Sequence, residues 1–83
     1  MSQPRLKWGE VERYFLRRGY TIRTGGTGEK QVVAPRGPDP KRTRPVVRIG
    51  HKWCARPGNE LLPAYVKAIE RAFGVTAEEI RGG

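Results

Sequence analysis

Residues 25 to 30, GGTGEK, place three glycines and one lysine within six positions, a composition that invites comparison with phosphate-binding loops. In the P-loop, glycine directly precedes the lysine and Ser or Thr directly follows it, because the hydroxyl holds the metal ion. Here Glu29 separates Gly28 from Lys30, and a carboxylate inside such a cradle would repel a phosphate. The spacing therefore argues against nucleotide binding and leaves two interpretations, a plain hairpin turn or the site of another chemistry.

His51 and Cys54 are the only histidine and the only cysteine of the chain. Histidine exchanges protons near neutral pH, so His51 is a candidate general acid or base, with a structural histidine or a phosphate contact as alternatives. Basic neighbours favour a thiolate at Cys54, which makes a Cys–His nucleophile a further hypothesis. One cysteine excludes an internal disulfide, and one cysteine with one histidine cannot complete a four-ligand zinc set. We expect no metal and no cofactor.

Residues 30 to 56 form a strongly basic span in which Asp39 is the only acidic residue. Basic side chains on loops and strands contact phosphates, and an aromatic ring among them stacks on unpaired bases. Trp53 has such a position, although it is equally suited to close the edge of a thin core. The alternative to nucleic-acid contact is that the whole span is a charged surface that faces only solvent. The candidate nucleic-acid contacts are Lys30, Arg36, Lys41, Arg42, Arg44, Arg48, Lys52, Trp53 and Arg56.

The chain of 83 residues carries 17 Lys and Arg against 8 Asp and Glu, a net charge of +9, which bears on partners rather than on fold. Nucleic acid is the first candidate partner, because neutralised phosphates release counterions. An anionic membrane surface is second, but the usual basic amphipathic helix is missing. An acidic protein is third, and a thermophile's charged surface is the alternative. Because no signal peptide or membrane-spanning apolar run is evident, we expect a cytoplasmic protein without a membrane partner.

Regular patterns predict the elements that position these residues. Trp8, Val11 and Phe15 have helical spacing, which predicts a helix from Trp8 to Arg18 that ends at Gly19. Alternation predicts strands over residues 20–24, 30–34 and 46–49, with GGTGEK as the hairpin between the first two. The proline-rich residues 35–45 and the basic residues 50–59 are predicted loops. A second helix is predicted over residues 61–73, with an apolar stripe made by Leu62, Val66, Ile69 and Phe73.

A last helical turn is predicted over residues 76–80, where Thr76 and Glu79 have the spacing of a capping box. The predicted class is therefore α+β, in the order α-β-β-β-α, with a three-stranded antiparallel sheet and two helices on one face. This is the architecture of double-stranded RNA-binding domains, which recognise A-form shape and phosphates. We expect a flexible lead-in over residues 1–7 and a single domain over residues 8–80.

Two stretches also match a family pattern. ELLPAYVKAIERAFGVTAEEI, residues 60 to 80, contains Glu-Leu, a proline, a small residue, and then a helix that bears isoleucine and ends at Gly-Val and an acidic turn. VERYFLRRGYTIRT, residues 11 to 24, contains a helix, a closing glycine–aromatic pair and a strand. In these features the chain resembles the HicA family, the small RNA-cleaving toxins of bacterial and archaeal toxin–antitoxin pairs. The resemblance covers most of residues 8 to 80, with 35–45 and 52–59 as insertions.

The resemblance gives the GGTGEK hairpin a specific meaning. In the family, a glycine and a basic residue at this place flank the catalytic histidine, at the start of the second strand. Gly28 and Lys30 match the flanking positions, but Glu29 stands where the histidine is expected. Glu29 could act as a general base on a ribose 2′-hydroxyl, with Lys30 offsetting phosphate charge and His51 as the acid–base partner. The alternative is that Glu29 is a solvated hairpin residue.

Three hypotheses follow for the function. The first is a HicA-like RNA-binding protein that cleaves mRNA without metal and leaves a 2′,3′-cyclic phosphate. The second is a catalytically silent nucleic-acid-binding module that has the fold without the histidine. The third is a basic protein that is masked by an acidic, antitoxin-like protein partner, where the excess charge serves association rate and specificity.

Overall fold

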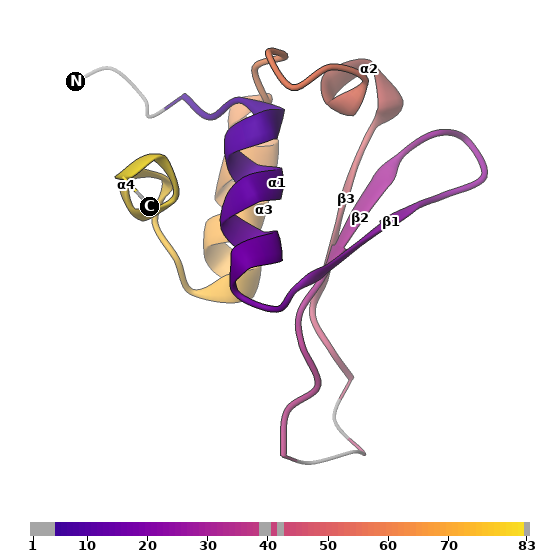
Figure 1. Ribbon diagram of the computed structural model, residues 1–83, viewed down its shortest axis with the longest axis vertical. Coiled ribbons are helices and arrows are strands. Elements are labelled where there is room, and N and C mark those ends of the chain that lie inside the picture. The colour runs from indigo at the N-terminus through magenta and orange to yellow at the C-terminus, as the bar shows by residue number, and fades with distance from the viewer. Residues whose placement is uncertain (1–4, 39–40, 42, 83) are drawn as a thin grey trace.

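The computed structural model describes residues 5–38, 41 and 43–82, and the predicted α+β class and α-β-β-β-α order are confirmed (Figure 1). Two short helices add to that order. One lies within the predicted basic loop 50–59, and the other extends the predicted final turn. The elements are α1 (Trp8–Arg17), β1 (Thr21–Thr24), β2 (Lys30–Val33), β3 (Val46–Ile49), α2 (His51–Cys54), α3 (Pro63–Phe73) and α4 (Ala77–Gly82).

The three strands form one antiparallel sheet with β2 in the middle. Lys30 pairs with Thr24 of β1 on one side and with Ile49 of β3 on the other. The β1–β2 turn and the start of α2 therefore lie at the same end of the sheet. Val33 pairs with Val46 at the opposite end, where the described residues 34–38 and 43–45 extend away from the helices (Figure 1).

The register assigns each strand residue to one of two faces, because successive side chains of a strand point in opposite directions. The inner face, which the helices cover, contributes Val32, Val47 and Ile49 to the core. The outer face contains the cross-strand row Arg23, Gln31 and Arg48. The complete outer set is Thr21, Arg23, Gln31, Val33, Val46 and Arg48.

Figure 1 shows α1 in front of α3, and both helices contribute side chains to the core that includes the inner face of the sheet. Phe15 of α1 is fully buried, and its ring centroid lies 5.1 Å from that of Phe73 and 4.7 Å from that of Tyr20. The aromatic contact thus joins both helices to the entry of β1. Burial of one such side chain contributes about 1.5–3 kcal/mol to folding, so this cluster is a large part of a thin core.

Helix α3 ends at Phe73, and the capping residue Gly74 adopts a left-handed φ of 68° and donates its N–H to the Glu70 carbonyl. The Glu70 carboxylate accepts the N–H of Ala77 at 2.8 Å, and Thr76 Oγ1 accepts the N–H of Glu79 at 3.1 Å. The predicted N-cap at Thr76 is therefore confirmed. These bonds hold α4 at the end of α3, from which it packs against α1.

The structure corrects two predictions about apolar residues. Leu6, within the predicted lead-in, is fully buried, and its carbonyl accepts the Leu61 N–H at 2.8 Å. The packed part of the chain therefore begins before residue 8, while residues 1–4 lie outside the described residues. Leu62, assigned to the buried stripe, is 41% exposed, whereas Leu61 is buried. The helix begins only at Pro63, so these two leucines are on extended backbone and point in opposite directions.

Candidate nucleic-acid interface

The GGTGEK stretch forms the turn of the β1–β2 hairpin. The Gly25 N–H donates to the Glu29 carbonyl at 2.8 Å, and the Gly28 N–H donates to the Gly25 carbonyl at 3.1 Å. Gly28 has φ of +84°, a left-handed conformation that glycine adopts without steric strain. The turn itself therefore explains the glycine at position 28.

A one-turn helix packs against this turn, where the sequence pattern predicted an irregular basic loop. Nδ1 of His51 lies 3.3 Å from the Gly28 carbonyl oxygen, and the Cys54 thiol lies 3.8 Å from the same oxygen. The thiol also donates to the Gly50 carbonyl at 3.3 Å. A Cβ added at Gly28 would lie 2.9 Å from His51 Nδ1. Two separate constraints therefore favour glycine at position 28, namely the left-handed φ and the close approach of the His51 ring.

The other two predicted catalytic side chains have partners within the hairpin. The Glu29 carboxylate accepts the hydroxyl of Thr27 at 2.6 Å, and Lys30 Nζ donates to the hydroxyl of Thr24 at 2.7 Å. His51 is exposed, and its ring contacts the Gly28 backbone. The fold thus brings His51 to the turn that holds Glu29 and Lys30, while each of the three side chains has a separate hydrogen-bond partner.

Cys54 is almost fully buried, at 3% exposure, and belongs to the core. Its thiol is surrounded by backbone carbonyls of the turn and of its own helix. A buried thiol of this kind is chemically inert rather than nucleophilic. The arrangement favours a packing role for Cys54 over the hypothesis of a Cys–His nucleophile.

Trp53 is half-buried and joins α2 to α3. Its ring lies edge-on to Tyr65, with centroids 5.5 Å apart, while the Tyr65 hydroxyl accepts the Gly50 N–H at 3.2 Å. Lys52 Nζ lies 5.5 Å from the Trp53 ring centroid. These contacts favour the interpretation of Trp53 as the edge of the core, and its remaining exposed surface borders a lysine.

The predicted basic residues fall into two groups at opposite ends of the sheet. Arg36, Lys41 and Arg44 lie on the β2–β3 connection, and Arg42 of that connection lies outside the described residues. The hairpin end holds the second group, which is Lys30, Lys52 and Arg56 with the ring of Trp53. These residues form one continuous basic span in the sequence, and the tertiary structure divides them between the two ends of the sheet.

Arg48 lies between the two groups, on the exposed outer face of the sheet. It shares a cross-strand row with Gln31 and Arg23, and neighbouring strands are separated by about 4.8 Å, so the two arginine Cα atoms lie roughly 10 Å apart. Within the described ranges, no carboxylate lies within ion-pair distance of Arg23 or Arg48. Arg23 is not among the contacts predicted from the sequence. The alternation of apolar and polar residues over 20–24 places Arg23 on the solvent-facing side of the strand, and this signal could have identified it.

No group of three or more His, Cys, Asp and Glu side chains among the described residues is arranged to hold a metal ion. None of the helices in that part of the chain has the length and apolar character needed to cross a membrane.

No family model, curated protein or solved structure matches this chain. The resemblance to the HicA family therefore rests on the sequence pattern alone.

Proposed function

We propose that the protein binds RNA through the outer face of its sheet and the adjoining hairpin end. The observation that carries this proposal is the arginine row, in which Arg23 and Arg48 flank Gln31 on an exposed face without a neutralising carboxylate in the described residues. Ile49 and Gly50 connect Arg48 to α2, which adds Lys52, and Arg56 follows just after that helix. A net charge of +9 supports the same class of polyanionic partner. A place in the cytoplasm, where mRNA is available, is part of this proposal.

RNA binding of this kind is electrostatic, so its salt dependence measures the number of phosphates contacted. The four basic side chains Arg23, Arg48, Lys52 and Arg56 would each contact one phosphate. On single-stranded RNA each contact contributes roughly 0.7 to the slope of log affinity against log salt concentration, so four contacts give a slope of about −3. The double variant Arg23→Ala, Arg48→Ala should reduce the steepness of that slope by about 1.4. Arg13→Ala with Arg17→Ala removes the same charge from α1, where both residues are exposed, and is the matched control.

We further propose that the hairpin end cleaves RNA by the metal-independent chemistry that the HicA resemblance implies. His51 is the best-supported acid–base group, because it is exposed and its Nδ1 faces the Gly28 carbonyl. With the proton on Nδ1, Nε2 accepts the proton of a ribose 2′-hydroxyl. The 2′-oxygen then bonds to phosphorus, the bond from phosphorus to the 5′-oxygen breaks, and the leaving oxygen takes up a proton.

The second candidate function is RNA binding without cleavage. It is supported by Glu29, which stands at the place of the expected histidine and whose carboxylate accepts a hydrogen bond from Thr27. The Lys30 ammonium group likewise has a partner within the hairpin, because it donates a hydrogen bond to the Thr24 hydroxyl. In this function the hairpin end contributes charge and shape, and no bond in the RNA is broken.

One experiment separates the two candidates. Pure protein is incubated with single-stranded and with structured RNA in the presence of chelator, and cleavage and binding are followed for wild type, Glu29→Ala and His51→Ala. Products with 2′,3′-cyclic ends that are lost in His51→Ala support the nuclease. Intact RNA that is retarded on a gel supports the silent binding module. Absence of binding at low salt overturns both and favours the third hypothesis, a basic partner of an acidic protein.

A further inference from the structure

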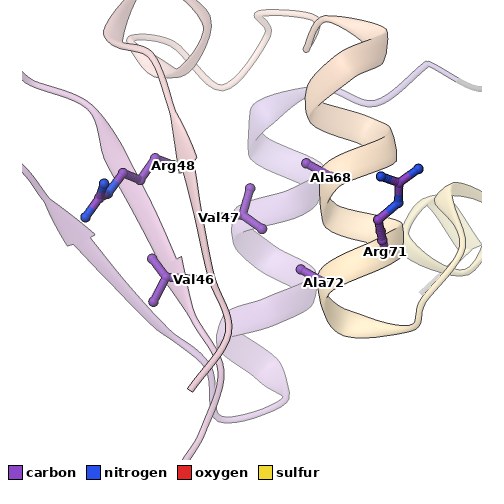
Figure 2. Close-up of a pocket in the computed structure, with 6 residues that line it drawn as sticks. All are labelled: Val46, Val47, Arg48, Ala68, Arg71 and Ala72. Carbon is purple, nitrogen blue, oxygen red and sulfur yellow. The ribbon is translucent and has the colours of Figure 1, made fainter. Parts of the chain in front are cut away.

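A groove lies between the outer edge of β3 and helix α3, away from the hairpin turn (Figure 2). Its volume is about 400 Å³, and its walls come from one strand and one helix. Figure 2 shows Val47 between the strand and α3, with Ala68 and Ala72 on the side of the helix that faces it. The lining residues are Val46, Val47, Arg48, Ala68, Arg71 and Ala72.

The strand wall of the groove is a sheet edge with backbone groups available for pairing. In an antiparallel ladder, residues alternate between facing the partner strand and facing away from it. The Ala34 N–H donates to the Pro45 carbonyl at 3.1 Å, so Pro45 faces β2. By alternation Val47 also faces β2, whereas Val46 and Arg48 direct their N–H and C=O groups to the open side. These two residues are about 6.6 Å apart along the strand, which is the repeat that an added strand requires.

The helix wall leaves room for the side chains of such a strand. Ala68 and Ala72 are four residues apart, and therefore lie one above the other on the same side of α3. Their methyl groups and the side chain of Val47 make an apolar floor. Inward-pointing residues of an added strand would lie over this floor, so small or branched apolar side chains fit there.

The charges at the groove select acidic partners. Arg48 points away from α3, on the face where the outward side chains of an added strand would lie (Figure 2). Arg71 is exposed on the helix side of the groove. Neither guanidinium has a carboxylate within ion-pair distance in the described ranges. A second copy of this chain would place like charges together, since each copy carries a net charge of +9.

We propose that this groove binds an extended segment of a protein partner that alternates apolar and acidic residues. The segment adds to the sheet as a fourth strand beside β3, with its apolar side chains over Ala68 and Ala72 and a carboxylate against Arg48. The proposal does not depend on RNA binding, because it rests on the sheet edge and the helix wall. It also accounts for an edge strand that is otherwise left unpaired, a feature that folded proteins usually cover.

The test uses fluorescence anisotropy with a labelled seven-residue peptide that alternates glutamate and valine, and with the same peptide carrying lysine in place of glutamate. We expect the acidic peptide to bind and the basic one not to bind. Arg71→Glu should weaken binding of the acidic peptide about tenfold. Lys67→Glu makes the same charge change on an exposed position of α3 outside the groove, and should have an effect of less than about twofold.

The backbone pairing is tested separately at Val46. Val46→Pro removes the outward N–H while leaving the ladder to β2 intact, whereas Val46→Ala retains that N–H. Binding should be lost in the first variant and retained in the second. Ala68→Phe fills the groove from an exposed helix position and should also abolish binding. Circular dichroism shows whether each variant is folded, and Ala68→Phe provides the test if Val46→Pro is unfolded.

Three results would overturn the proposal. The first is that the lysine peptide binds as well as the glutamate peptide. The second is that the acidic peptide binds wild type and Ala68→Phe equally, or binds neither. The third is a concentration-dependent dimer in sedimentation that Ala68→Phe abolishes, because this result would assign the groove to a second copy of the chain.

Discussion

Gly28→Ala is the substitution for which the structure makes the sharpest prediction. Gly28 has φ of +84°, and an alanine in the left-handed region is less stable than glycine by about 1–2 kcal/mol. The added Cβ would lie 2.9 Å from Nδ1 of His51, which must therefore move. Because His51 is exposed, its displacement adds little to the strain, but it breaks the 3.3 Å approach to the Gly28 carbonyl.

Two other glycines separate these effects. Gly19 has φ of +82° with nothing within 4 Å of an added Cβ. Gly19→Ala therefore introduces the same backbone strain as Gly28→Ala but no steric contact with another side chain. Gly26 has neither a positive φ nor a neighbour within 4 Å, so Gly26→Ala should change stability by less than about 0.5 kcal/mol. For a domain of this size, 1–2 kcal/mol lowers Tm by roughly 5–15 °C.

The assay combines thermal unfolding with NMR of the His51 ring. We expect Gly28→Ala and Gly19→Ala to lower Tm by similar amounts, and only Gly28→Ala to shift the ring resonances. If Gly28→Ala and Gly26→Ala unfold at the same temperature, the left-handed turn at Gly28 is refuted. If the ring resonances are the same in Gly28→Ala as in wild type, the contact between α2 and the hairpin turn is refuted.

Four further outcomes are expected. Cys54 should react with a thiol reagent only as fast as the protein unfolds, because it is 3% exposed, and rapid labelling of native protein would contradict this burial. Leu6→Ala should destabilise the fold by about 2–5 kcal/mol, whereas Leu62→Ala should be nearly neutral in the same urea titration, since Leu6 is fully buried and Leu62 is 41% exposed. Thr76→Ala should lose about 1 kcal/mol with its N-cap bond, and Thr76→Ser should recover most of it. Because Arg48 belongs to both proposed surfaces, the glutamate–valine peptide should compete with RNA in an anisotropy titration; simultaneous binding without mutual weakening would contradict that overlap.

The sequence by itself determined the main elements, because their patterns are local. The 46–49 strand was predicted with the bounds that the structure has, and the helix that begins at Trp8 was predicted to within one residue of its end. The apolar spacing of Trp8, Val11 and Phe15 is enforced by the helical repeat, and all three are buried. The unequal charge of residues 30 to 56 is likewise a property of the sequence alone.

Only the tertiary structure decided how the candidate site is assembled. Helix α2 is a single turn, too short for a periodic signal, and it is held by contacts of His51 and Cys54 with Gly28, far from them in sequence. The same contacts brought His51 to the hairpin, while strand alternation placed Arg23 and Arg48 in one row. Leu6 is fully buried, and its carbonyl accepts the N–H of Leu61, a residue far from it in sequence. Such long-range contacts have no signature in a local pattern, because they arise only when strands and helices pack together.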